Sequence, residues 1–332
     1  MKKIIFMITL ALLLSQNEVC LEIESNPYPN SPALGCFSKY INVLDCFGVY
    51  AQSGISDEKA LHVAAVAAEL LDNNEDGVVD DENIFNSLQE NGALMPVFTS
   101  DGNSCMDDFE DHYNGDGVSA VLFRGEIDPS QPGHWGDDAT VEEVLHTINH
   151  VGHVSVYPDY FDIDPNSSVM SEAMDLARGG QFLSVPNEYP DVAWYHYDDW
   201  TCDYQCMAIE YMYWCIVSQM GILDDPQTCS GIDNEWEPCS PELFESTDVM
   251  MFNLITDPVH KIPQLAPDGN YCPPTGPLGD VNGDGSLDIL DIIMVVSIIL
   301  GNDPFSSSAD MNSDGIVNIL DVIALVNSIL LP

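Results

Sequence analysis

Two stretches near the C-terminus repeat one spacing of oxygen-bearing side chains. Residues 280–291 read DVNGDGSLDILD, and residues 310–321 read DMNSDGIVNILD. Oxygen side chains at positions 1, 3, 5, 9 and 12, with glycine at position 6, form the pattern of a calcium loop. Calcium takes six to eight oxygen ligands, and a backbone carbonyl at position 7 adds to the set. The two stretches therefore predict two bound calcium ions.

The predicted ligands follow from this numbering. Those of the first loop are Asp280, Asn282, Asp284, Ser286, Asp288 and Asp291. Those of the second loop are Asp310, Asn312, Asp314, Ile316, Asn318 and Asp321. Ser286 and Ile316 contribute through their carbonyl groups, because they occupy position 7.

The tandem loops, each followed by an apolar run, resemble a type I dockerin, a module that docks secreted proteins onto cohesin domains. The resemblance covers residues 279–332 and implies calcium binding and a cohesin-like partner. In dockerins the residues just before the last ligand help to choose the partner. Here they are Ile289–Leu290 and Ile319–Leu320, where cellulosomal dockerins commonly carry hydroxyl side chains. The alternative is a calcium-stabilised C-terminal cap without a partner.

A third stretch has the calcium-loop pattern with an altered last position. Apolar residues recur at helical spacing over residues 57–71, and DNNEDGVVDDEN follows at 72–83. The whole of 57–90 resembles an EF-hand, and position 12 holds an amide in place of the usual carboxylate. That change predicts weak calcium binding, about 10⁻⁴–10⁻³ M. The alternative is an acidic helix–turn–helix without metal. The predicted ligands are Asp72, Asn74, Asp76, Val78 (carbonyl), Asp80 and Asn83.

Histidines gather on one predicted helix in the middle of the chain. Residues 141–153 read VEEVLHTINHVGH, so Glu143, His146, His150 and His153 follow one another at spacings of three, four and three. These spacings place the four side chains on one helix face. Two histidines four residues apart are typical of a helix that gives two ligands to a zinc ion. Glu172, on a later helical stretch, adds a carboxylate.

A predicted strand at 119–127, the histidine helix and the later carboxylate together resemble a zincin-type metallopeptidase domain over residues 119–220. The resemblance implies zinc bound by His146 and His150, with Glu172 or His153 as third ligand. The general base of such enzymes follows the first histidine, and that position holds Thr147. Threonine cannot accept a proton from water as a carboxylate does, so the domain is either inactive or uses Glu143.

A later aromatic stretch at 193–214 adds further candidates. His196 or Tyr195 could hydrogen-bond a developing oxyanion in a zincin-like site. Asp198 and Glu210 could instead form the acid pair of a glycoside hydrolase, and the tryptophans and tyrosines around them suit sugar stacking. Three hypotheses remain: a docked, metal-binding and inactive domain; a metallopeptidase with an unusual base; and a polysaccharide-degrading hydrolase. The structural alternative is a polar helix face hydrogen-bonded to acidic loops.

Composition limits the partners and the compartment. Seven Lys and Arg oppose 55 Asp and Glu, a formal charge of −48, which excludes nucleic-acid binding. Residues 1–16 have the charged start and apolar run of a secretory signal peptide, and no later stretch predicts a membrane span. The ten cysteines are typical of a secreted, extracellular or cell-surface protein with disulfides, and pairs such as Cys36–Cys46 or Cys229–Cys239 are candidates.

The helical spacings around these motifs and the single predicted strand indicate a mainly α (α+β) fold. We expect a secreted body over 17–272 in which helices and a small sheet position the central histidines. A Pro/Gly linker at 273–279 separates it from a dockerin-like pair of loop–helix units at 280–332.

Overall fold

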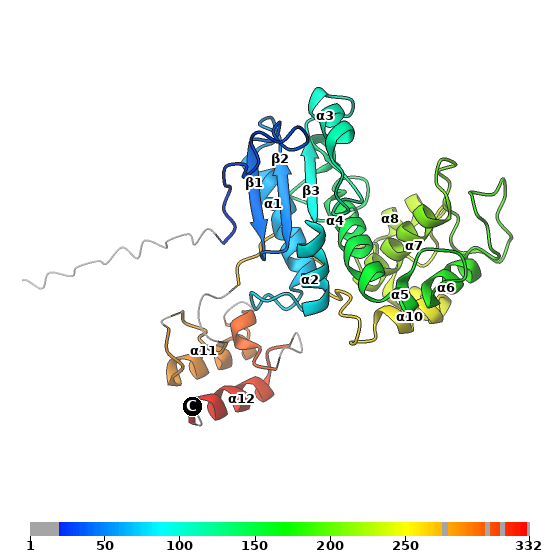
Figure 1. Cartoon of the computed structure of the whole chain (residues 1–332). Helices are drawn as coiled ribbons and strands as arrows, with labels where there is room; N and C mark the ends of the chain where they lie inside the picture. The colour runs from blue at the N-terminus through cyan, green and yellow to red at the C-terminus, as the bar shows by residue number, and fades with distance from the viewer. Residues whose placement is uncertain (1–19, 274–277, 284, 303–305, 313–315, 331–332) are drawn as a thin grey trace, which may run out of the picture.

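The computed structural model describes residues 20–273, 278–283, 285–302, 306–312 and 316–330. The predicted signal peptide, most of the predicted linker, and the predicted ligands Asp284 and Asp314 lie outside these ranges. The described chain is mainly helical with one small sheet, which confirms the predicted fold class (Figure 1).

The sheet has four strands in the order β1-β2-β3-β4. They span Lys39–Val43, Phe47–Ala51, Leu94–Phe98 and Leu122–Phe123. The first pair is an antiparallel hairpin in which Ile41 lies opposite Val49, and β3 and β4 are added in parallel. The strand predicted over 119–127 is reduced to two residues, because the chain enters a 3₁₀ turn at Arg124–Glu126.

The two faces of the sheet have different coverings. Alternate residues such as Ile41, Val49 and Val97 join a large core with helix α1 (Asp57–Leu71), whose bounds are those predicted. The residues between them, such as Tyr50 and Phe98, join a smaller core with α3 (Ser104–His112) and the N-terminal segment. Helix α2 (Glu82–Asn91) lies between α1 and β3 in the chain.

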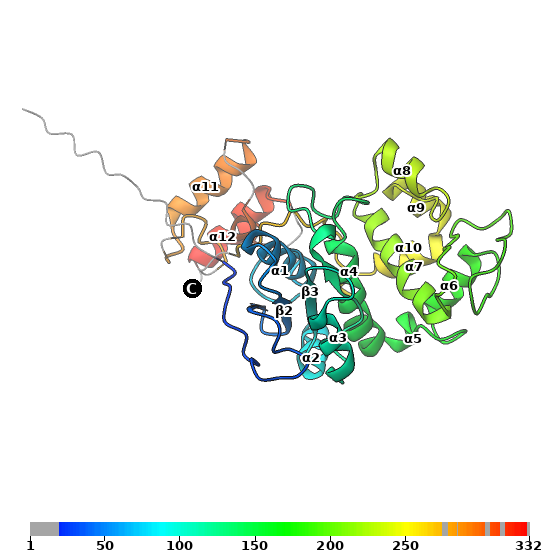
Figure 2. The same cartoon turned by 90° about the horizontal axis from the view of Figure 1, so that it is seen from above.

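A helical half completes the body. Its central element is α4 (Thr140–Ile148), which continues as a π-helical turn over Asn149–Val154. Because α4 packs against both α1 and α7, it joins the sheet half to the other helices (Figure 2). The other helices are α5 (Pro158–Phe161), α6 (Val169–Ala177), α7 (Tyr204–Gln219), α8 (Pro226–Ile232), α9 (Pro241–Thr247) and α10 (Val249–Ile255).

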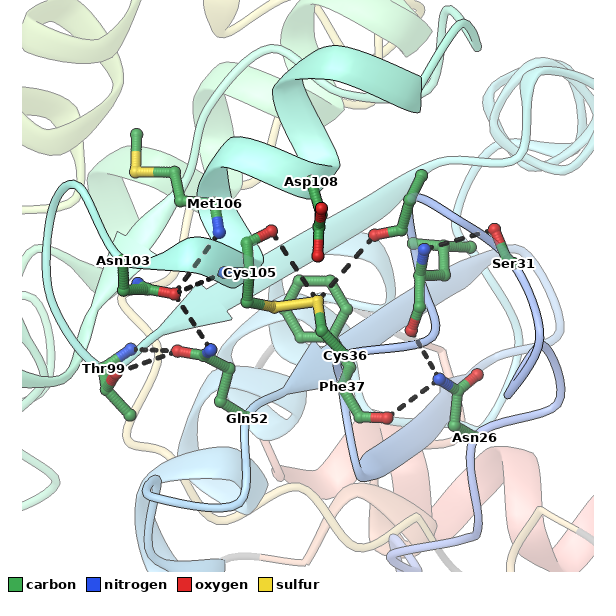
Figure 3. The surroundings of a disulfide bond; sticks show 12 residues. Asn26, Ser31, Cys36, Phe37, Gln52, Thr99, Asn103, Cys105, Met106 and Asp108 are labelled. Carbon is green, nitrogen blue, oxygen red and sulfur yellow. Dashed lines mark hydrogen bonds between the residues drawn. A yellow bond between two sulfur atoms is a disulfide. The ribbon is translucent and has the colours of Figure 1, made fainter.

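Four disulfides brace the described body. The predicted pair Cys229–Cys239 is confirmed, and Cys202 bonds Cys206. The predicted pair Cys36–Cys46 is wrong: Cys36 bonds Cys105 of α3, and Cys46 is a buried thiol facing the main core (Figure 3). The fourth bond, Cys20–Cys272, joins the two ends of the body.

The C-terminal unit is built from α11 (Ile289–Ile299) and α12 (Ile319–Leu330), which pack against each other. Val295, Ala309 and Leu325 form its buried centre. Within the described ranges, no helix combines the length and the apolar character that crossing a membrane requires.

Candidate metal sites

The first C-terminal loop is held by its first and last carboxylates. The Asp280 carboxylate accepts a hydrogen bond from the Gly285 amide at 2.7 Å. Asp291 is fully buried, and its carboxylate accepts the amides of Val281 at 2.9 Å and Asp288 at 2.9 Å. Both acids therefore turn into the loop, as positions 1 and 12 of a calcium site require.

The second loop repeats this arrangement. Asp310 and Asp321 are buried, and the Asn318 amide donates to Asp321 Oδ2 at 2.7 Å. The other carboxylate oxygen of Asp321 is buried and makes no hydrogen bond to any described residue. Buried oxygens are normally paired, so this oxygen is suited to face an ion.

The calcium-type loop of the body, residues 72–83, resembles the C-terminal loops in its first half. Asp72 is fully buried, and its two carboxylate oxygens accept the amides of Asp76 at 3.1 Å and Gly77 at 2.7 Å. The hydroxyl of Tyr271 also donates to Asp72 at 2.6 Å. Asn83, the predicted last ligand, is exposed on the first turn of α2. Burial raises the pKa of Asp80, position 9, to about 6.

A separate cluster joins α4 to α7. Ligand atoms of Glu142, His146 and Glu210 all lie within 4.8 Å of one another. His146 Nε2 lies 3.3 Å from a carboxylate oxygen of Glu210 without forming an aligned hydrogen bond, and Nδ1 lies 3.5 Å from Glu143. One imidazole and two or three carboxylates converging from two helices form a ligand set suited to a divalent transition-metal ion.

The cluster carries an excess of negative charge. Burial raises the pKa of Glu142 to about 8, and the neighbouring Glu210 and Glu143 add to this. Burial alone would lower the pKa of His146, but the carboxylates of Glu210 and Glu143 raise it well above its ordinary range. Burial likewise raises the pKa of Glu235 to about 7. A cation bound among these groups would relieve their mutual repulsion.

Contacts of one carboxylate, that of Asp138, fix the start of α4. Asp138, just before the helix, accepts the Thr140 hydroxyl at 2.6 Å and the Gly133 amide at 2.9 Å. His62 of α1 contacts the same carboxylate at 2.9 Å. Burial alone would raise the pKa of Asp138, but these partners lower it, so the helix start is held by a charged side chain.

Contacts with α2 fix the C-terminal end of α4, where the helix continues as the π-helical turn. The Ser87 hydroxyl donates to the carbonyl of Val151 at 2.7 Å, and Gly152 lies directly beneath Ile84. A Cβ at Gly152 would lie 3.1 Å from that side chain, so the glycine permits the close approach. The π-helical turn falls at this contact and interrupts the α-helical spacing of the histidines.

The predicted zinc ligands are separated by this turn. His150 lines a cavity of about 270 Å³ together with His146 and Glu210, but it is outside the three-residue cluster. His153 is buried against Phe161, and burial lowers its pKa to about 4. Glu172 is exposed on α6. Neither His153 nor Glu172 lines the cavity, and Glu210 of α7 lies where a third ligand was expected.

The predicted oxyanion donors also lie elsewhere. Tyr195 is fully buried, and its hydroxyl donates to the carbonyl of Met207 at 2.8 Å. His196 Nε2 lies 3.0 Å from the carbonyl of Ala193. The next tyrosine, Tyr197, lies beside Glu210: burial and then the Glu210 charge raise the pKa of its hydroxyl. Asp198, the proposed partner of Glu210 in a glycosidase, is exposed.

Three residues of the cluster region were missed or given another role by sequence reasoning. Glu142 lies four residues before His146, a spacing that could have indicated it as a ligand. The sequence pattern places Glu210 in the acid pair of a glycoside hydrolase, and it favours Tyr195 and His196 over Tyr197. No local signal connects α7 with α4, because their contact depends on the fold.

Comparison with known families identifies one part of the chain. Residues 278–330 match the family model of the dockerin type I domain. The C-terminal region is thus a dockerin domain, a calcium-binding docking module, and the match includes none of the body. No curated protein and no solved structure matches the chain.

Proposed function

We propose that this protein is a secreted, dockerin-borne metalloprotein whose body binds a transition-metal ion between α4 and α7. The observation that carries the proposal is the convergence of Glu142, His146 and Glu210 within 4.8 Å. The ion, zinc in the simplest case, would supply Lewis-acid chemistry beside the cavity. The four disulfides support export, because such bonds persist in oxidising compartments.

A zinc titration of metal-stripped protein tests the body site. We expect one zinc site in the wild type, with affinity reduced at least about 100-fold in His146→Ala and Glu210→Gln. His112→Ala, which removes an exposed histidine from α3, is the matched control and should bind as the wild type does. Equal zinc affinity in all four proteins would refute the site.

Docking is the second part of the proposal. The dockerin helices expose apolar side chains at matching positions, and Ile289, Ile293, Ile319 and Ile323 are each more than half exposed. Exposed apolar patches of this kind mark interaction surfaces. We propose that they contact a cohesin-like partner, with calcium holding the two helices in place.

A binding assay against a panel of cohesin domains tests docking. We expect at least one calcium-dependent pair, with affinity reduced at least about tenfold by the double substitution Ile289→Asp/Ile319→Asp. Leu265→Asp, at an exposed apolar position of the body, is the control. Failure of every cohesin to bind, or binding insensitive to the double substitution, would contradict the proposed surface.

Peptide hydrolysis is a second candidate activity, favoured by the cavity beside the cluster. Ser119 and Gln205 line this cavity with His150, so a substrate could reach His146 and Glu210. Glu143 lies 3.5 Å from His146 and is the nearest predicted base. Cleavage of a fluorogenic peptide library that is lost in Glu143→Gln, with zinc binding retained, would support it. If the zinc-loaded protein cleaves no peptide, the peptidase hypothesis is refuted and the body is a metal-binding domain without this activity.

A further inference from the structure

A second pocket lies on the sheet face turned away from α1. Its cavity volume is about 420 Å³, within the range of small-ligand sites, and it shares no lining residue with the cavity beside the metal cluster. Four tyrosines from four parts of the chain line it: Tyr28, Tyr40, Tyr50 and Tyr113.

The tyrosine rings that line the pocket are held in place by contacts within the protein. Tyr40 of β1 and Tyr50 of β2 lie opposite each other in register, with ring centroids 4.9 Å apart. Gly48 leaves the backbone beside them bare: a Cβ there would lie 3.0 Å from the Tyr50 ring and 3.1 Å from the Tyr40 ring. Tyr113 is stacked on Phe109 at 4.8 Å. Fixed rings offer contact area at little entropic cost on binding.

The wall that carries Tyr28 is also fixed. The Asn26 side chain donates to the carbonyls of Leu34 at 2.6 Å and Phe37 at 2.9 Å, and the Cys36–Cys105 disulfide ties this segment to α3 (Figure 3). Tyr28 itself is 56% exposed, so its ring is accessible at the pocket edge.

Several polar groups of the pocket have no hydrogen-bond partner among the described residues. The hydroxyls of Tyr28, Tyr40 and Tyr50 make no hydrogen bond to any residue in the described ranges, although Tyr50 is only 5% exposed. The Tyr50 ring is largely buried, but its hydroxyl is not among the enclosed polar atoms of the protein, so it is accessible to a ligand in the pocket.

The amides at the rim are oriented by the protein. The NH₂ groups of Asn42 and Gln89 donate to Asp45, at 2.6 Å and 3.0 Å, and that of Asn91 donates to the Ser87 carbonyl at 2.8 Å. Their amide oxygens accept no hydrogen bond from a described residue. The lining contains no Lys or Arg, which disfavours an anionic ligand.

We infer that this tyrosine pocket binds a neutral glycan chain. The apolar face of a pyranose ring packs on aromatic rings, while sugar hydroxyls accept from tyrosine and donate to amide and carboxylate oxygens. The pocket also combines tyrosine hydroxyls, which can donate, with amide oxygens, which can accept. A sugar uses both kinds of group, whereas a choline-like cation uses neither as its main contact, which favours the glycan.

Calorimetric titration of the full chain with cello-, xylo-, manno- and laminarihexaose, and with choline as a cation probe, tests this inference. We expect at least one hexaose to bind, with affinity reduced tenfold or more by Tyr40→Ala and by Tyr28→Ala. Tyr28→Ala keeps the test valid if Tyr40→Ala does not fold, because Tyr28 is largely exposed. Trp200→Ala, at an 82% exposed aromatic position outside this pocket, should bind as the wild type does.

Three results would overturn the inference. They are binding of no hexaose by the wild type, hexaose binding unaffected by both tyrosine substitutions, and binding of choline alone. The metal cluster plays no part in this test, so its outcome is independent of the proposed function.

Discussion

Two calcium-type loops of this chain begin alike and end differently. In the dockerin domain Asp280 accepts the Gly285 amide at 2.7 Å, and in the body Asp72 accepts the Gly77 amide at the same distance. Both glycines have positive φ, 82° and 89°, which favours glycine at position 6. The first half of each loop is therefore set by the same turn.

The helix start accounts for the difference. In the dockerin loop the N-cap is Asp288, position 9, and Asp291 on the first turn points inward. In the body the N-cap is Asp81, position 10, so α2 begins one residue later and Asn83 is exposed. Tyr271 instead contacts Asp72, the predicted first ligand. The N-cap, as well as the spacing, therefore decides which side chain turns into the loop.

The largest expected effect is on the dockerin loop. Asp291→Ala removes a buried carboxylate and leaves the amides of Val281 and Asp288 without their acceptor. We expect calcium affinity of this loop to fall about a thousand-fold, measured by calorimetry. Asp101→Ala, which removes an exposed acid from the body, is the charge-matched control. A loss below tenfold would mean that Asp291 is not a ligand.

The stability of the body should depend on pH through a buried histidine, a residue type that the dockerin region does not contain. Burial lowers the pKa of His153 from 6.5 to about 4, so the unfolded chain binds a proton in this window and the folded chain does not. The contribution of His153 to the free energy of unfolding should therefore fall by up to about 3 kcal/mol as pH drops from 6.5 to 4, while the raised pKa of Asp80 acts in the opposite direction. The dockerin region, 280–332, contains no histidine.

Urea unfolding across this range, with His153→Leu for comparison, measures the effect. The substitution should remove the loss of stability that His153 causes on acidification, so the wild type should lose more stability than His153→Leu between pH 6.5 and 4, whatever the absolute stabilities. The same slope in both proteins would exclude His153 as the cause.

Tyr271→Phe tests how the body loop is closed. It removes a hydrogen bond to a buried carboxylate, so we expect the body to lose about 2 kcal/mol in urea unfolding. Tyr160→Phe, on an exposed tyrosine, should have no effect. Equal stability of the two variants would show that Asp72 does not depend on Tyr271.

The smallest effect on calcium affinity is expected for position 12 of the body loop, where the two loops differ most. Asn83→Ala should change calcium affinity of the body loop by less than about twofold, because the side chain is exposed. Fluorescence titration with calcium measures it, and Asn91→Ala on the same helix is the control. A tenfold loss would show that Asn83 turns inward when calcium binds. The body loop would then close through position 12, as the dockerin loop does.

Local patterns made part of this structure predictable. The predicted ligands of each dockerin loop fall within twelve consecutive residues, and the family match confirms the domain. The apolar spacing of α1 gave its observed bounds, since helix period and capping are properties of the local sequence.

The body cluster depends on contacts that no local pattern contains. Glu210 meets His146 only because α7 packs on α4. The π-helical turn after Ile148 likewise places His153 toward Phe161 rather than beside His150, although an ideal helix would align them. Cys36 pairs with Cys105 because the N-terminal segment lies against α3. Spacing therefore identified the helix that carries the proposed metal site but not its partners.

Elemental analysis of the purified mature protein, dialysed against calcium-containing buffer, measures whether the body holds a transition metal. We expect about one transition-metal ion per chain in the wild type, lost in His146→Ala and Glu210→Gln, with calcium content unchanged. Calcium alone in the wild type, or a transition metal retained by both variants, would contradict a metal centre between α4 and α7.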